Sequence, residues 1–125
     1  WGLNLERFET FLQALPKGYR YAFEFRETSW LSKDVYKLLK KRGHALCLYE
    51  FAGVKTPLLV TAKFIYVRLH GPKGAYQGSY SSRALDKWAK QFLEWKKKGI
   101  EVYCYFDNDE KGYAAQNALQ LLKKL

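Results

Sequence analysis

A short segment with strict alternation constrains this chain most: residues 64–71 read FIYVRLHG. Side chains along a β-strand point alternately to its two faces, so Tyr66, Arg68 and His70 share one face. The aliphatic residues between them share the other face and are suited to burial. The segment therefore predicts a strand that buries one face and presents an arginine and a histidine at its carboxyl end.

Two other segments repeat this design. In residues 20–27, RYAFEFRE, Glu24 and Arg26 alternate with two phenylalanines, and in residues 101–109, EVYCYFDND, Asp107 follows an alternating run. The carboxyl ends of parallel strands meet at one edge of a sheet, which is where α/β proteins place their ligand sites. The three segments therefore predict a site built on the strand ends of a parallel sheet.

Apolar residues at helical spacing fill the stretches between the strands. Strands are expected at residues 19–26, 44–50, 63–70 and 100–106. Helices are expected before the first strand, between the first and second, between the third and fourth, and after the fourth. Only a short turn is expected between the second and third strands, and a polar, Gly-rich connection should follow the third.

Local signals set the ends of these helices. Asn4, Ser29 and Ser82 are the expected caps of the first three helices, and Gly43 and Gly99 should end the second and third. The apolar stripe of the last helix is predicted to consist of Ala115, Ala118, Leu119 and Leu122.

This alternation predicts an α/β fold with a parallel sheet and right-handed crossovers. Four βα units form either a small open sheet or half of a TIM-type (β/α)8 barrel, which needs about 250 residues. An open sheet covered by helices on both faces would be apolar on both. Because one face here carries charged residues at the strand ends, we favour a single domain, residues 1–125, that forms a parallel-stranded half-barrel.

Composition narrows the class of protein. No apolar run approaches the ~20 residues that span a bilayer, and Cys47 and Cys104 lie in apolar runs typical of buried, reduced thiols, so we expect a cytoplasmic protein. The net charge is +10, but many basic residues fall at predicted helix ends, where cations are favourable. Because the sequence contains no methionine, we expect a fragment, a designed chain or a processed product.

Three ordered motifs resemble the YecE-like family, domain of unknown function 72. They are FEFRETSW (residues 23–30), FIYVRLHGP with a downstream YQGSYS (64–72 and 76–81), and YFDNDEKGYAAQNAL (105–119). The resemblance spans nearly the whole chain and implies the C-terminal half of a TIM-type barrel. Because the family's activity is unsettled, the resemblance implies no reaction.

Two arginines on one face are the clearest chemical clue. Guanidinium groups bind carboxylate and phosphate oxygens bidentately, so Arg26 and Arg68 predict capture of a small anionic or phosphorylated ligand. Pairing of these arginines with Glu24 and Asp107 is the alternative. His70 is the expected proton-transfer residue because imidazole titrates near neutrality, with Glu24 and Asp107 as partner acids.

Other residues are assigned more weakly to the site. Trp30 is interpreted as core packing or a wall of the mouth, and Tyr80 as part of either a mobile cover or an ordinary loop. Asn108 and Asp109 are interpreted as mouth residues or caps of the last helix. The sequence identifies no cofactor and predicts no metal site, although His70 with nearby carboxylates could form a mixed site.

Two other kinds of function stay open from the sequence. The positive charge and the tyrosine-rich loop fit a nucleic-acid-binding module, whose binding would depend on the lysines at residues 96–98. An inactive half-barrel is the other alternative. Since open sheet edges must be covered, it should pair with a missing N-terminal half, form a homodimer that rebuilds eight strands, or be poorly soluble.

Overall fold

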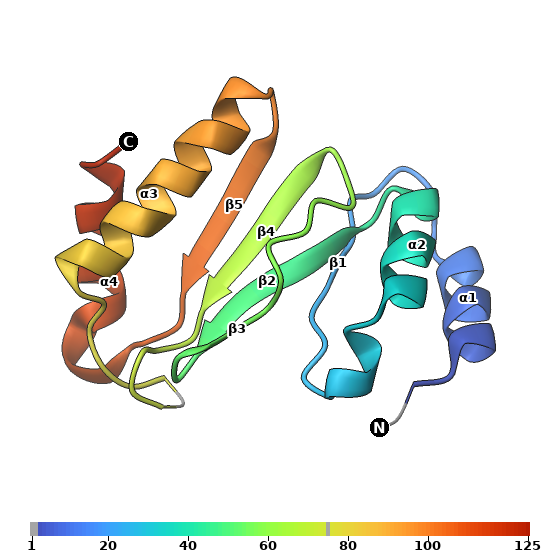
Figure 1. Cartoon of the computed structure of the whole chain (residues 1–125), viewed down its shortest axis with the longest axis horizontal. Coiled ribbons are helices and arrows are strands. Elements are labelled where there is room, and N and C mark those ends of the chain that lie inside the picture. Colours follow the sequence, from blue (N-terminus) through green and yellow to red (C-terminus); the bar gives the residue numbers. More distant parts are fainter. Residues whose placement is uncertain (1–2, 75) are drawn as a thin grey trace.

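The computed structural model describes residues 3–74 and 76–125 and is built around one curled sheet (Figure 1). Four parallel strands lie in the order β1-β2-β4-β5. Their bounds are β1 (Ala22–Phe23), β2 (Ala45–Phe51), β4 (Phe64–Leu69) and β5 (Glu101–Phe106). A fifth short strand, β3 (Val54–Lys55), returns antiparallel beside the end of β2. The predicted parallel α/β fold is confirmed.

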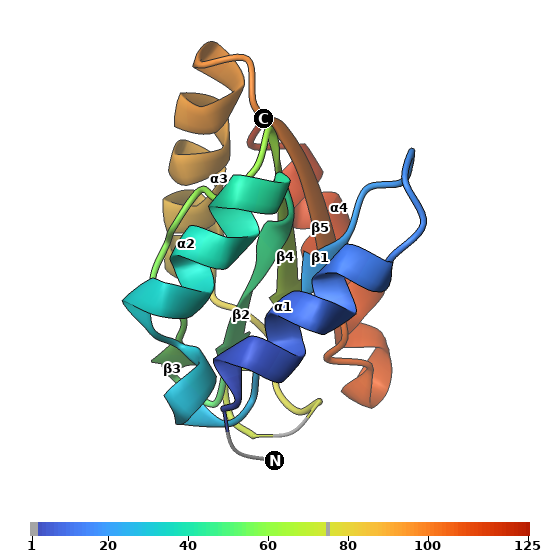
Figure 2. The same cartoon turned by 90° about the vertical axis from the view of Figure 1, so that its right-hand side faces the viewer.

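Four helices separate and flank the strands. They are α1 (Leu5–Ala14), α2 (Lys33–Arg42), α3 (Ser82–Lys97) and α4 (Tyr113–Leu122), with short 3-10 turns η1 (Thr28–Trp30) and η2 (Glu110–Gly112) before α2 and α4. Figure 2 shows α1 and α2 together on the β1 side, while α3 and α4 pack beside β5. The basic last turns expected from the sequence are present in α2 and α3.

The core lies between the helices and one face of the sheet. The buried cluster takes Leu48, Val67 and Leu69 from the strands and Leu39 and Trp88 from the helices. Val67 and Leu69 belong to the face that alternation assigned to burial. The opposite, concave face carries tyrosines and charged residues and is hollowed into a cleft of about 460 Å³.

The first strand is much shorter than the predicted residues 19–26. Only Ala22 and Phe23 pair with β2, and the chain then diverges from it. One edge of β2 is paired with β4, so β3 pairs with the opposite edge. This is the same edge along which a longer β1 would have to pair. Just after β3, the hydroxyl of Thr56 accepts a hydrogen bond from the N–H of Tyr49 in β2 at 3.1 Å. The sequence did not predict this hairpin.

Two predicted helix caps were wrong by one to three residues. Ser32, not Ser29, caps α2, because its hydroxyl accepts from the Val35 N–H. Ser29 instead donates its hydroxyl to Glu27 within η1. Ser81, not Ser82, caps α3. The cap of α1 at Asn4 is confirmed.

The predicted apolar stripe of the last helix was also wrong. Leu119 and Leu122 are 61% and 65% exposed, whereas Ala114, Asn117 and Leu121 are buried. A buried asparagine lies in the middle of the core-facing side, so a pattern based on hydrophobicity selected the wrong face.

Gly71, which follows His70, occupies a backbone conformation and a space that exclude other residues. Its φ is +131°, and a Cβ there would lie 2.6 Å from the Gln77 carbonyl oxygen. We expect Gly71→Ala to lower the free energy of unfolding by at least about 2 kcal/mol, from backbone strain plus the clash. Gly18→Ala is the matched control in urea unfolding, since Gly18 also has positive φ but open space around it. Equal effects of the two substitutions would contradict the clash.

Candidate functional site

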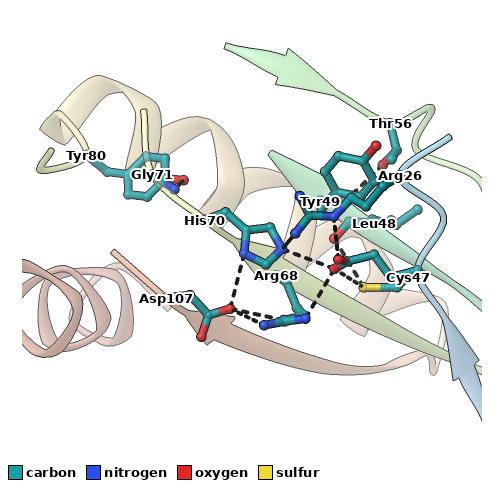
Figure 3. Close-up of polar contacts among 11 residues, drawn as sticks. Arg26, Cys47, Leu48, Tyr49, Thr56, Arg68, His70, Gly71, Tyr80 and Asp107 are labelled. Carbon is teal, nitrogen blue, oxygen red and sulfur yellow. Dashed lines mark hydrogen bonds and ion pairs between the residues drawn. The ribbon is translucent and has the colours of Figure 1, made fainter. Parts of the chain in front are cut away.

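The predicted charged residues meet at the carboxyl ends of the strands (Figure 3). Glu24 and Arg26 lie just beyond β1, Arg68 lies near the end of β4 with His70 just after it, and Asp107 follows β5. They form one connected set of ion pairs and hydrogen bonds, which we call the strand-end cluster. The sequence predicted the members of this cluster from alternation alone.

His70 is the completely buried member of the cluster, at 0% exposure. Its Nε2 lies 3.0 Å from Glu24 Oε1 and 3.0 Å from Arg26 Nη2, and its Nδ1 lies 3.4 Å from Asp107 Oδ2. The rings of Tyr49 and Phe51 stand edge-on to the imidazole. A ligand therefore cannot reach His70 directly in this conformation, and any proton it moves must pass through a neighbour.

Arg68 bridges the same two carboxylates as His70. Its Nε and Nη2 lie 3.0 and 2.8 Å from Asp107 Oδ2, and its Nη1 lies 3.5 Å from Glu24 Oε1. The four side chains thus close a ring in which each basic group contacts both acidic ones. This is the internal pairing that the sequence offered as the alternative to anion capture, and it commits Arg68 to a largely structural role.

Arg26 is held differently. Its Nε donates to Glu24 Oε2 at 2.6 Å, and its guanidinium lies 5.1 Å and 5.5 Å from the ring centres of Tyr49 and Phe51. Cation–π contacts of this kind orient an arginine without neutralising it. Its side chain is still 46% exposed, more than any other charged group of the cluster. Arg26 is therefore the more exposed of the cluster's two arginines, ahead of Arg68 at 35%.

The cluster keeps the Glu24 carboxylate ionised. Burial raises the pKa of the Glu24 carboxyl, but hydrogen bonds from Arg26 and His70 lower it by more, so the pKa lies below its ordinary value. Burial lowers the pKa of Arg68, but Asp107 and Glu24 raise it by more. With neutral His70, two guanidinium groups balance two carboxylates, and the cluster carries no net charge.

The concave cleft begins at this cluster and continues toward the opposite end of the strands. Glu24 and Arg68 line it together with Cys47, and the rings of Tyr66 and Tyr105 stack at 5.3 Å within it. Burial raises the pKa of Cys47 and raises that of Cys104 to about 12, so both thiols stay protonated near pH 7. Both are free, as predicted from the sequence.

A buried polar network lies behind the cluster and was missed by the sequence analysis. Asn117 Oδ1 accepts from the Tyr80 N–H at 3.0 Å and from Asn108 Nδ2 at 2.8 Å. The Tyr80 hydroxyl accepts from the Gly71 N–H at 2.9 Å. The network ties α4 to the loop after His70 and to the residue after Asp107. The sequence signal for this network is a polar residue, Asn117, among the alanines and leucines of the last helix.

Several predicted ligand contacts lie elsewhere. Tyr80 and Asn108 are buried in this network, so neither reaches the mouth in this conformation. Trp30 stacks on Phe25 at 5.1 Å in the core, and it also lines the apolar groove that Glu24 and Arg26 share. Asp109 is exposed ahead of η2, and Gly112 rather than Asn108 or Asp109 precedes α4 as its cap.

Neither a metal site nor a membrane-spanning helix is found in the described residues. Across residues 3–74 and 76–125, no group of three or more His, Cys, Asp or Glu side chains is arranged to hold a metal ion. Within the same residues, none of the helices combines the length and apolar character needed to cross a bilayer.

Comparison with known proteins decides the family. Residues 2–125 match the family described as "Protein of unknown function DUF72". The chain belongs to the DUF72 family. The sequence is 30% identical to the UPF0759 protein YunF of Bacillus subtilis (strain 168) over 129 aligned residues, which cover 83% of this chain and 46% of that protein. This confirms the resemblance noted from the three motifs.

Solved structures of DUF72 proteins share the fold. A DUF72 protein of Thermotoga maritima MSB8 is 29% identical with a TM-score of 0.82, over 95% of this chain and 50% of that one. One from Enterococcus faecalis V583 is 20% identical with a TM-score of 0.83, over 99% and 54%. The chain therefore spans about half the length of the DUF72 proteins it matches.

Proposed function

We propose that the strand-end cluster of this DUF72 protein binds a small oxyanion, a carboxylate or phosphate group, through Arg26. The single observation that carries the proposal is the state of Arg26. Its guanidinium is oriented by Glu24 on one edge and by two aromatic rings below, yet its side chain is 46% exposed. An arginine fixed in this way can offer its outer edge to two oxygens of one ligand group.

The charges of the cluster support a ligand of low charge. Arg26 and Arg68 are already balanced by Glu24 and Asp107, so the site does not resemble the excess positive charge that binds polyphosphates. The concave cleft of about 460 Å³ is lined by Glu24, the partner of Arg26, and by cysteine and tyrosine side chains, and it leaves room for a small organic body attached to the anionic group. Arg26 itself lines the neighbouring apolar groove beside β1. Proton transfer, if part of the reaction, would use Glu24 or Asp107 at the ligand and His70 behind them.

The test is a binding titration with inorganic phosphate and with acetate. We expect Arg26→Ala to weaken binding of the preferred anion by about tenfold or more, because a charge-assisted hydrogen bond typically contributes that much to the binding free energy. Arg20→Ala is the matched control, because Arg20 likewise pairs with a glutamate, Glu101, but at the start of β5, the end of the strands opposite to the strand-end cluster. Equal loss in both variants, or no binding by the wild type, would contradict the site.

We also propose that the outer strands are completed by strands from beyond the described residues. Within those residues β1 and β5 each pair with one neighbour, and apolar grooves adjoin both strands. A helix flanks each outer strand: α1 packs on the β1 side through Phe8 and Phe23, and α4 packs beside β5. Their outer residues Phe11 and Leu122 are 52% and 65% exposed.

This arrangement supports an N-terminal half as the partner rather than a second copy. In a ring of two copies, α4 of one copy and α1 of the other would share a single strand–strand junction. Helices pack 8–10 Å apart, whereas neighbouring strands lie about 4.8 Å apart, so one junction does not accommodate both. A partner that begins and ends on a strand avoids this conflict.

Mixing experiments test the partner. We expect the chain to form a 1:1 complex with the N-terminal half of a full-length DUF72 protein, seen by sedimentation as roughly a doubling of mass. By itself the chain should self-associate without reaching one defined size. A stable monomer or a discrete homodimer that ignores the added half would contradict this proposal.

Nucleic-acid binding is the second candidate, supported by the positive charge of helices α2 and α3. Together α2 and α3 hold ten basic and three acidic residues. Five of the ten lie in the last turns, where the helix ends stabilise them. Oligonucleotide binding that weakens steeply with salt, and is lost when residues 96–98 are neutralised, would favour this candidate.

A further inference from the structure

We propose that anion binding at Arg26 is coupled to uptake of a proton by His70. The inference rests on the proposed oxyanion site and concerns how that site is regulated. Its basis is a competition at one atom: His70 Nε2 lies 3.0 Å from both the Arg26 Nη2 donor and the Glu24 Oε1 acceptor.

A single imidazole nitrogen can serve only one of these partners at a time. Arginine has no acceptor, so Arg26 bonds to Nε2 only when Nε2 carries a lone pair. Neutral His70 then has its hydrogen on Nδ1, which lies 3.4 Å from Asp107 Oδ2 but makes no hydrogen bond within the described residues. Protonated His70 has no lone pair. It donates from Nε2 to Glu24, it keeps its Nδ1 charge near Asp107, and it no longer holds Arg26.

The protonated state therefore frees Arg26 Nη2 to turn toward a ligand. The neutral tautomer with its hydrogen on Nε2 would also release Arg26, but it would leave the Nδ1 lone pair 3.4 Å from the Asp107 carboxylate oxygen. In the neutral state, His70 and Glu24 together occupy the Nη2 and Nε atoms of the guanidinium. Release of Nη2 frees both of its hydrogens, so that Nη2 joins Nη1 in contacting an oxyanion without competition from His70.

Charge balance favours the same coupling. With neutral His70 the two arginines and two carboxylates of the cluster cancel, so a bound anion leaves negative charge unbalanced, one unit for a carboxylate and two for sulfate. A proton on His70 offsets one unit of this charge. Because His70 is completely buried, water screens this imbalance poorly.

The titratable and charged groups that face His70 among the described residues come from several elements. Glu24 and Arg26 approach from beyond β1, the Tyr49 ring from β2, the Tyr76 ring from the following loop, and Asp107 from beyond β5. Burial raises the pKa of Tyr49, so its hydroxyl stays neutral near pH 7. Glu24 and Asp107 are thus the anions that stabilise a protonated His70.

Sulfate is the suitable probe, because it keeps its charge across the range of about pH 5 to 8 in which histidine titrates. We expect wild-type protein to bind sulfate at least about fivefold more tightly at the acidic end of this range than at the basic end, a typical coupling strength. By reciprocity, adding sulfate at a fixed pH should increase the protonated fraction of His70. Imidazole nitrogen NMR measures that fraction, and since His44 is the other histidine of the sequence, His44→Gln assigns the signals.

The His70→Gln variant separates the coupling from the site itself. It should still bind sulfate, but with an affinity that no longer changes with pH. Sulfate binding by the wild type with equal affinity across the range and an unchanged His70 signal would overturn the coupling and leave the oxyanion site standing. Absence of sulfate binding at every pH would overturn both. If His70→Gln does not fold, the pH dependence of sulfate affinity and the His70 NMR signal of the wild type decide whether the coupling exists.

Discussion

Replacing Glu24 by glutamine should lower the free energy of unfolding by about 3 to 4 kcal/mol at neutral pH. Glu24 contacts Arg26, Arg68 and His70 at once, and its side chain is only 17% exposed. Glutamine keeps the shape but removes the charge, so two guanidinium groups in a partly buried cluster lose half of their compensation. Urea unfolding of the two proteins measures the difference.

Glu101→Gln is the matched control for this substitution. Glu101 also pairs with an arginine on the concave face, but both side chains of that pair are more than half exposed. Because exposed ion pairs contribute little, Glu101→Gln should change stability far less. Similar losses for the two variants would show that the strand-end cluster is not the source of the effect.

The same carboxylate should give the protein an acid-sensitive stability. The pKa of Glu24 is lower in the folded protein than in the unfolded chain, so its contribution is present above the unfolded value. The contribution is lost as pH falls through the lowered folded value. The difference in free energy of unfolding between wild type and Glu24→Gln should therefore shrink on acidification. A difference that stays constant down to low pH would contradict this assignment.

Asn117→Ala should be nearly as damaging, with a loss of about 3 kcal/mol. Asn117 is 1% exposed, and its Oδ1 accepts hydrogen bonds from the Tyr80 N–H and from Asn108 Nδ2. Alanine leaves both buried donors without this acceptor, and each costs about 1–3 kcal/mol. The loop after His70 should loosen as well, because the Tyr80 hydroxyl bonds to the Gly71 N–H.

Thermal unfolding and amide exchange check this prediction together. Slowed exchange of the Gly71 and Tyr80 amides should be lost in Asn117→Ala before global unfolding. Gln116→Ala, at the exposed neighbouring position of α4, is the control and should stay within about 0.5 kcal/mol of wild type. Unchanged protection of both amides in Asn117→Ala would mean that the network does not anchor the loop.

The strand-end cluster could be predicted from the sequence because its determinants are local. Alternation in the segments around Glu24, Arg68 and Asp107 assigns each charge to a face, and parallel strands bring their carboxyl ends together. Comparison with solved DUF72 structures agrees with the half-barrel derived in this way.

The features that could not be predicted depend on partners distant in the chain. Tyr80 and Asn117 are separated by 37 residues, and a tyrosine in a Gly-rich loop is equally typical of a surface cover. The shortness of β1 depends on the β3 hairpin competing for the edge of β2. Leu119 and Leu122 suited a buried stripe by hydrophobicity, but the core-facing side of α4 is set by the bonds of Asn117.

A crystal structure of the protein grown with sulfate or phosphate tests the central proposal most directly. We expect the anion within hydrogen-bond distance of the Arg26 guanidinium, with Glu24 and Asp107 still facing the two nitrogens of His70. An Arg26 without an anion at saturating concentration, with the charged groups of the cluster turned away from one another into solvent, would contradict the proposed site.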